Sequence, residues 1–266
     1  MEVKNKNSGL DILGIQPISK AIDTTVEKSF QGVEGFLQKV CVPALEELGL
    51  MIRDKIRNWR LKNILQIIEK SKGKLNFQDE QLQLKIQAHP RVALGIIDNG
   101  SIVDNEELQD MWAGLFASSC TKEGQDDENL IFVNLLKQLT IVEAKILNYS
   151  CPLCQKILYK NGLISGDEVY IDFKSLTEIS GVSEFYRLDR ELDHLRTLGL
   201  IGDNDFTGGG FSIYDDHLIA DITPTTLALN FYVKCQGHNI DPRFYWKEGI
   251  ITEEEWEKEK EEQAST

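Results

Sequence analysis

Apolar residues recur at steps of three and four along residues 43–72, which is the spacing of one face of an α-helix. The stripe consists of Leu45, Leu48, Ile52, Ile56 and Trp59. Pro43 suits the first turn of such a helix, because its fixed φ is helical and the first turn leaves its N–H position unpaired. We therefore expect one long amphipathic helix over residues 43–72. A helix of this kind buries its stripe against other helices, which predicts a helical bundle.

The same predicted helix is basic along one flank. Positive residues stand at positions 53, 55, 57, 60, 62, 70, 72 and 74, and only Asp54 and Glu69 oppose them. This excess of positive charge needs compensation. The candidate residues for binding an anion or an acidic partner surface are Arg53, Arg57, Arg60 and Lys62. The alternatives are compensation by the acidic tail over residues 253–262 and a solvated helix face.

A second helical stripe covers residues 12–40. Such a stripe is typical either of a bundle helix or of a helix that lies on a membrane surface. Membrane-surface helices usually carry a one-sided basic face. The polar face of this stripe instead mixes both signs of charge, with Asp23, Glu27 and Glu34 beside Lys20, Lys28 and Lys39. We therefore expect packing into the bundle, and a membrane surface is the disfavoured alternative.

The periodicity of the sequence changes after Gly162. Residues 169–173 alternate like a short strand, 175–180 suit a short helix, and 183–198 suit a longer helix. Two strand-like segments within residues 211–222 then predict a hairpin. A short helix, a longer helix and a hairpin follow one another in this order in a winged helix-turn-helix.

The expected fold is therefore mainly α. Residues 1–160 are expected to form an N-terminal helical bundle, and residues 161–240 a winged-helix-like α+β domain. Residues 241–266 are expected to form an acidic C-terminal helix or tail around Trp256. A chain of 266 residues is long enough to bury a core in each of the two domains.

The composition argues against several classes of protein. The formal net charge of -14 disfavours broad contact with DNA or RNA, because nucleic-acid binders need positive charge to neutralise phosphates. No window approaches the roughly 20 apolar residues of a membrane-spanning helix, and the first residues lack the apolar core of a signal peptide. The 5 cysteines are an odd number, which fits a reducing compartment. We expect a cytoplasmic protein with free thiols.

Two short motifs together contain the ligand types of a zinc site. Cys151 and Cys154 form a CxxC, and Cys235 and His238 form a CxxH. Zinc-binding pairs usually lie on tight turns, whereas Cys151 directly follows one predicted helix and Cys235 ends another. Ordinary semi-buried thiols are therefore expected, and no cofactor is predicted. A zinc site formed by these four residues remains the alternative.

Arg187 and His194 lie on one predicted helix and are separated by six residues. This spacing is found in helical ribonucleases of the HEPN class, in which an arginine and a histidine act on the RNA backbone. The favoured interpretation is a pair of solvated or partner-bound side chains, because both fall on the second helix of the expected helix-turn-helix. That helix also contains Glu184, Asp189, Glu191 and Asp193. So much negative charge disfavours contact with DNA and favours protein interaction or dimerisation.

Three segments of the sequence carry a resemblance to a known family. They are PALEELGLMIRDKIRNWRLKNILQIIEK at 43–70, EELQDMWAGLFASSC at 106–120 and ITPTTLALNFYVKC at 222–235. The middle segment is followed by LKQLTIVEAKIL at 136–147. In these segments the chain resembles the bacterial abortive-infection alpha (Abi-alpha) family, and the resemblance covers most of the chain. It implies a role in bacterial defence against phage, by halting or killing the infected cell, and it brings no catalytic residues.

The expected function is therefore non-enzymatic anti-phage defence through contacts with a protein partner or an anionic ligand. The expected partner is a second copy of the chain, an operon-encoded protein or a phage component. Two alternatives belong to other classes: a HEPN-like ribonuclease toxin that uses Arg187 and His194, and a winged-helix transcriptional regulator. The sequence leaves open the trigger, the target, and the choice between killing the host and blocking the phage directly.

Overall fold

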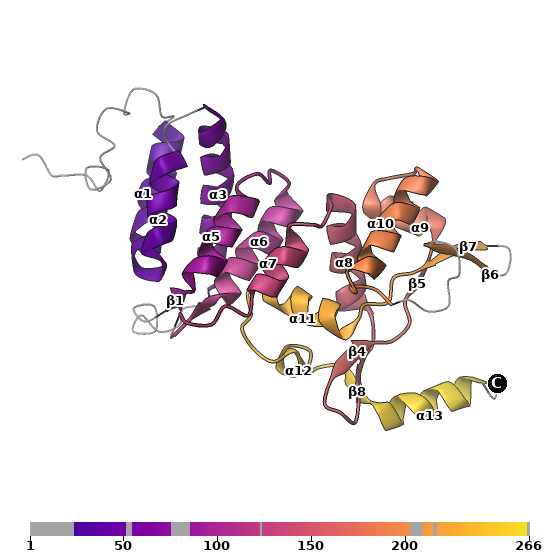
Figure 1. The fold of residues 1–266 in the computed structure, drawn as a ribbon. Coiled ribbons are helices and arrows are strands. Elements are labelled where there is room, and N and C mark those ends of the chain that lie inside the picture. The colour runs from indigo at the N-terminus through magenta and orange to yellow at the C-terminus, as the bar shows by residue number, and fades with distance from the viewer. Residues whose placement is uncertain are drawn as a thin grey trace, which may run out of the picture. The chain divides into compact units, whose positions relative to one another are not determined.

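The computed structural model of this 266-residue chain describes residues 24–51, 55–75, 86–122, 124–202, 210–214 and 217–264. Within these ranges, the side chains of 24–31, 48–51, 55–58, 214 and 263–264 are not described. The described part is mainly α-helical with small sheets, as the sequence predicts (Figure 1). The chain divides into two compact units, Met1–Lys137 with Cys235–Gly237 and Gln138–Lys234 with His238–Thr266.

Helices dominate the first unit. They are α1 (Thr24–Val40), α2 (Val42–Met51), α3 (Lys55–Lys74), α5 (Pro90–Gly100), α6 (Glu106–Ser118) and α7 (Leu130–Leu136). A short antiparallel pair joins β1 (Gln87–Ala88) to β2 (Cys120–Thr121). The most extensive packing in the unit is between α3 and α6. It buries Leu61 of α3 together with Trp112 and Phe116 of α6, and burial of such large apolar side chains is the main source of stability.

The stretch expected to form one helix over residues 43–72 is occupied by two helices, α2 and α3, which contact each other. Residues 52–54 lie outside the described residues. Side-by-side packing lets α2 bury Ala44 and Leu45 while α3 buries Ile64 and Ile68. A continuous helix would hold the two segments in line and out of contact, so apolar burial favours the two-helix arrangement.

Helix α1 packs against α2 and α3, and its apolar face is buried at Val33 and Leu37. Phe36 meets Phe116 of α6 edge to face, with the ring centroids 6.2 Å apart. The described part of the stripe over 12–40 therefore lies within the bundle, and residues 12–23 lie outside the described residues. Among the helices that the structure describes, none is both long enough and apolar enough to cross a membrane.

The second unit begins with α8 (Ile141–Leu153), which packs against α9 (Phe173–Ser180) and α10 (Phe185–Thr197). The sequence predicts a domain boundary near residue 160, which would place α8 in the N-terminal bundle. The boundary between the compact units falls before α8, at Gln138. Contact with α9 and α10 makes α8 part of the second unit.

Residues 170–221 contain a strand, two helices and a hairpin in the order expected from the sequence. β5 (Tyr170–Asp172), β7 (His217–Asp221) and β6 (Phe211–Tyr214) form an antiparallel sheet in the order β5-β7-β6. Asp172 caps α9 by accepting a hydrogen bond from the backbone N–H of Ser175. Gly181 ends α9 with a φ of 73°, a left-handed conformation that residues with a Cβ rarely adopt. Helix α11 (Thr226–Cys235) follows the hairpin.

A second sheet of the same unit is not predicted by the sequence analysis. β3 (Lys156–Leu158) pairs antiparallel with β4 (Ile164–Gly166) and parallel with β8 (Ile250–Thr252). Strands of three residues are too short to show alternation, and β8 comes from the expected tail. The tail region also contains α12 (Pro242–Tyr245) and α13 (Glu253–Ala264), so it contributes to the sheet as well as forming a helix.

Candidate functional site

A buried polar network joins the start of α8 to α10. Thr140 and Glu143 form a capping box, in which Oε2 of Glu143 accepts from the Thr140 backbone N–H at 2.8 Å and the Thr140 hydroxyl accepts from the Glu143 N–H at 3.2 Å. The other carboxylate oxygen of Glu143 lies 2.6 Å from Nδ1 of His194. The Glu143 side chain is 0% exposed. The network therefore holds His194 by a carboxylate that the fold encloses.

A second carboxylate of the network holds Arg187. Oε2 of Glu191 accepts from the Thr140 hydroxyl at 2.5 Å, and its Oε1 lies 3.6 Å from Nε of Arg187. Arg187 and His194, the candidate ribonuclease pair, are thus brought into one network, but each is bound to a different glutamate. The network links α8 to α10 and satisfies the polar groups that it buries.

Burial raises the pKa of the Glu143 carboxyl, because the charged form loses contact with water. The Thr140 N–H and His194 oppose this shift, and the negative charge of Glu191 adds to it. Two carboxylates that bond to the same threonine, Glu143 through its backbone N–H and Glu191 through its hydroxyl, occur in acid–base sites as well as in structural networks. The geometry alone therefore supports a positioning role, and a catalytic role needs a separate test.

Three basic residues of the flank, Arg60, Lys70 and Lys72, form ion pairs within the first unit. The guanidinium of Arg60 donates to the Ser101 hydroxyl at 2.9 Å and lies 3.7 Å from the carboxylate of Asp98. Lys70 lies 2.7 Å from the carboxylate of Asp110. Lys72 pairs with Glu69 on its own helix at 3.1 Å. These carboxylates belong to α3, α5 and α6, so for these three residues the compensating charge comes from the first unit and not from the tail over 253–262, which was one of the alternatives.

For the other three candidates on this flank, the structure describes one side chain out of three. Lys62 is exposed and forms no ion pair in the described part of the chain. Arg57 lies in α3, but its side chain is not described, and Arg53 lies outside the described residues. Of the two candidates whose side chains the structure describes, Arg60 and Lys62, it is Lys62 that is accessible to a partner.

The four alternative zinc ligands are not brought together. Within the described residues, which include Cys151, Cys154, Cys235 and His238, no three His, Cys, Asp or Glu residues form a group able to hold a metal ion. The thiol of Cys151 points to the carbonyl of Ala228, and the thiol of Cys154 to the carbonyl of Cys151. Burial raises the pKa of both thiols, which disfavours the thiolate that zinc requires. The ring of His238 packs against Tyr245.

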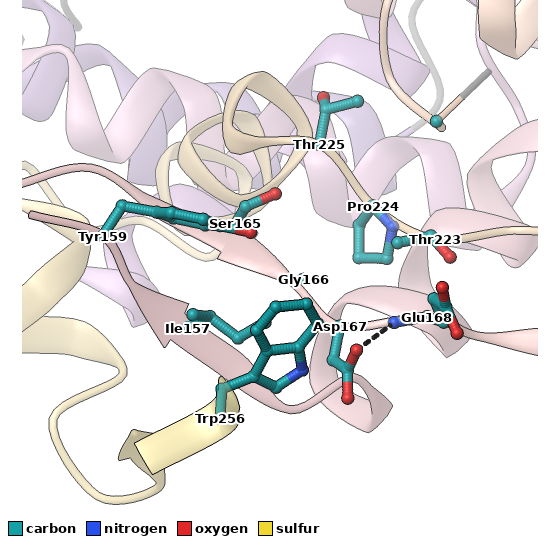
Figure 2. A pocket seen from close by; sticks show the side chains of 11 residues that line it. Ile157, Tyr159, Ser165, Gly166, Asp167, Glu168, Thr223, Pro224, Thr225 and Trp256 are labelled. Atoms are coloured by element: carbon teal, nitrogen blue, oxygen red, sulfur yellow. Dashed lines mark hydrogen bonds between the residues drawn. The ribbon is translucent and has the colours of Figure 1, made fainter. Parts of the chain in front are cut away.

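The second unit also contains a pocket of about 240 Å³. Its walls come from β3, β4, the segment after β4, the turn before α11 and α13 (Figure 2). The aromatic part of the lining is Tyr159 and Trp256, and Ile157 and Pro224 add apolar surface. The polar part consists of the carboxylates of Asp167 and Glu168 and the hydroxyls of Ser165, Thr223 and Thr225. This mixture of ring faces and carboxylates is able to bind a small polar ligand.

A family model described as abortive infection alpha matches residues 60–238 of the chain. The chain belongs to the abortive infection alpha family. Membership of this family associates the chain with defence by abortive infection and confirms the resemblance found in the sequence. No curated protein and no solved structure matches the chain.

The part matched to the abortive infection alpha family covers most of the features described above. It begins within α3 at Arg60 and ends at His238, just after α11. It includes the network around Glu143 and most of the pocket lining, whereas Trp256 and the rest of α13 lie beyond it.

The partners of Arg187 and His194 were not predicted from the sequence. For Glu143 a signal was available, since Thr140 and Glu143 have the spacing of a capping box, in which the glutamate is held at a helix start. For the pocket no signal was available, because Asp167 and Trp256 meet only through the pairing of β3 with β4 and β8.

Proposed function

We propose that this abortive infection alpha protein acts in defence by binding a protein partner, without catalysing a reaction. The surface proposed for this contact is the winged-helix-like part of the second unit. The observation that carries the proposal is a cluster of half-buried and exposed apolar side chains on α9, α10 and β6, of which Phe185, Tyr186 and Ile213 are the exposed ones. Its members, called the aromatic cluster below, are Phe173, Phe185, Tyr186, Phe211 and Ile213.

The aromatic cluster is exposed in part, and its rings pack against one another. Tyr186 is 72% exposed and Ile213 is 76% exposed. The ring centroids of Phe185 and Phe211 lie 5.0 Å apart, and those of Phe173 and Phe211 lie 5.7 Å apart. Rings that support one another lose little conformational entropy on binding, and aromatic residues supply much of the energy of protein interfaces. Contiguous exposed apolar surface of this kind marks interaction sites.

The ribonuclease alternative has less support. Arg187 and His194 stand two turns apart on α10, a rise of about 10 Å along the helix axis. Each is paired with an enclosed carboxylate, Glu191 or Glu143. A pair that acts on one phosphodiester needs its charged groups free to meet the substrate. Binding is therefore the better supported function.

The transcriptional-regulator alternative is also less well supported. Two of the three arginines on α10 are engaged within the fold, Arg187 with Glu191 and Arg196 with the carbonyls of Gly210 and Asp221. A helix that reads DNA presents such side chains to phosphates and base edges. The acidic residues of α10 would repel the same phosphates.

A second contact is proposed on the basic flank of α3. Lys62 is exposed there, and Arg53 and Arg57 are the other residues that the sequence selects. Arg60 is committed to Asp98 and Ser101, so it supports the helix more than it offers a free charge. An acidic partner surface would complement this flank. A Lys62→Glu variant should then weaken binding of the partner in a reconstituted assay. The loss of affinity should be larger at low salt than at high salt.

Plaque formation and host survival test the proposed function. We expect Tyr186→Ser combined with Ile213→Ser to abolish protection against a phage that the wild type restricts, since both side chains lie on the proposed surface. The matched control is Ile131→Ser on α7, where an isoleucine that is 60% exposed lies outside the cluster. Equal thermal midpoints would show that all variants fold. Full protection by the double variant would contradict the proposal.

The partner is proposed to be a second copy of the chain, an operon-encoded protein or a phage component. Sedimentation of the purified wild type and of the Tyr186→Ser, Ile213→Ser variant separates the first case from the others. A dimer that the double variant loses would identify a second copy. A monomer in both samples would direct the search to the other two partners.

A further inference from the structure

The pocket of Figure 2 places negative charge beside aromatic rings. Asp167 and Glu168 are neighbours in the chain, and both line the pocket. Tyr159 and Trp256 line it as well. A carboxylate attracts an ammonium group by charge, and the face of an indole attracts it through the ring quadrupole. The lining therefore has the chemistry of a site for an organic cation.

One side chain of the protein already makes these contacts. Nζ of Lys260, on α13, lies 3.5 Å from Oδ1 of Asp167 and 3.5 Å from Oε2 of Glu168. The same Nζ lies 5.6 Å from the centroid of the Trp256 ring. An ammonium group can thus reach both carboxylates and the indole at once. In the described part of the chain, this one lysine forms the ion pairs of both carboxylates, so one negative charge is left over.

The surroundings of the pocket favour positive charge. Burial raises the pKa of the Tyr159 hydroxyl, and the charges of Glu253 and Asp167 raise it further. Negative charge that opposes ionisation of a phenol also stabilises a nearby cation. The indole N–H of Trp256 adds a second possibility for recognition, because it is buried and finds no acceptor in the described part of the chain. A ligand carbonyl close to the ammonium group could accept a hydrogen bond from this indole N–H.

We propose that this pocket binds an organic ammonium group, the side chain of a lysine or a free primary amine of similar size, in competition with Lys260. A volume of about 240 Å³ suits a group of a few carbon atoms and is small for a nucleotide. Ligand binding would release Lys260 from Asp167 and Glu168 and would thereby free α13 from this contact. This site is independent of the aromatic cluster, because it is lined by other residues.

The test uses the indole signals of the four tryptophans in a ¹H–¹⁵N spectrum of the full chain, with n-butylammonium chloride as the probe. The Trp256 signal is assigned by its loss in Trp256→Phe. We expect this signal to move in a saturable way, while those of Trp59 and Trp112 stay in place and serve as internal controls. Sodium chloride controls for ionic strength, and 1-pentanol is the neutral molecule of matched size. No shift with the ammonium probe, or an equal shift with 1-pentanol, would overturn the proposal.

Variants connect the shift to the carboxylates. Asp167→Asn combined with Glu168→Gln should weaken binding of the probe by about tenfold or more, since hydrogen bonds to charged groups contribute roughly 1.5–3 kcal/mol. Glu257→Gln, which removes an exposed carboxylate from α13, is the matched control and should bind like the wild type. Lys260→Gln removes the internal competitor and should bind the probe more tightly. Unchanged affinity in the double variant, or weaker binding by Lys260→Gln, would contradict the proposal.

Two further probes distinguish the source of the ammonium group. Nα-acetyl-lysine methylamide presents it on a peptide backbone, whose carbonyl can accept from Trp256. Tighter binding of this probe than of n-butylammonium would assign the site to a lysine of a polypeptide. Tighter binding of n-butylammonium would assign it to a free amine. Failure of both would overturn the site and leave the proposed role of the aromatic cluster intact.

Discussion

At the scale of single residues, Glu143 is a carboxyl side chain that the fold removes from water. It is fully enclosed, it closes the capping box of α8, and it holds His194. Two opposing effects act on it, since burial favours the neutral acid while the Thr140 N–H and His194 favour the carboxylate. Burial is the larger effect, so the carboxyl pKa is raised in the folded protein.

A raised carboxyl pKa makes stability depend on pH in a definite direction. The folded state binds the Glu143 proton more tightly than the unfolded state, so this residue contributes stability at low pH that is lost as pH rises through the folded pKa. Glutamine is neutral at every pH and lacks this contribution. We therefore expect the difference in thermal midpoint between wild type and Glu143→Gln to move in favour of the wild type as pH falls from 7 towards 5. Differential scanning calorimetry across this range measures it, and a difference that stays constant with pH would contradict the account.

At the scale of elements, the close approach of α6 to the carbonyl of Cys235 is made possible by Gly114. A Cβ at position 114 would lie 1.6 Å from that carbonyl oxygen, which is a severe overlap with backbone. We expect Gly114→Ala to destabilise the protein by at least about 1–3 kcal/mol, the usual cost of overpacking. Urea unfolding followed by circular dichroism measures the change.

Gly35 in α1 provides the matched control for this prediction. A Cβ there would meet no atom within 4 Å, and alanine is the better helix former. Gly35→Ala should therefore leave stability unchanged or raise it by roughly 0.5–1 kcal/mol. If Gly114→Ala were as well tolerated as Gly35→Ala, the described packing of α6 would be wrong.

Elements with a strong local signal were predicted well from the sequence. The short helix expected over 175–180 is present as α9, and the two strand-like segments expected within 211–222 pair as β6 and β7. Asp172 and Gly181 provide the local signals at the two ends of α9. The division of residues 43–72 into α2 and α3 was missed because both helices share one helical periodicity. Only their mutual packing, which is a tertiary effect, separates them.

At the scale of the whole molecule, the mainly α character and the family could be read from the sequence, whereas the candidate sites could not be assembled from it. The spacing of Arg187 and His194 correctly places them on one helix, but it carries no information about their carboxylate partners. Glu143 comes from α8, and Glu191 faces inward from α10 itself. The pocket depends on β8, a strand of three residues in a segment that reads as a charged tail.

The central claim is that this abortive infection alpha protein defends by contact and not by cleaving RNA. The most direct test is phage protection by a variant that carries Arg187→Gln and His194→Gln. Glutamine at position 194 can still donate to Glu143, so the link between α8 and α10 should persist, and the thermal midpoint checks that it does. We predict protection equal to that of the wild type. Loss of protection in a variant that melts like the wild type would contradict the claim and would make Arg187 and His194 the catalytic pair.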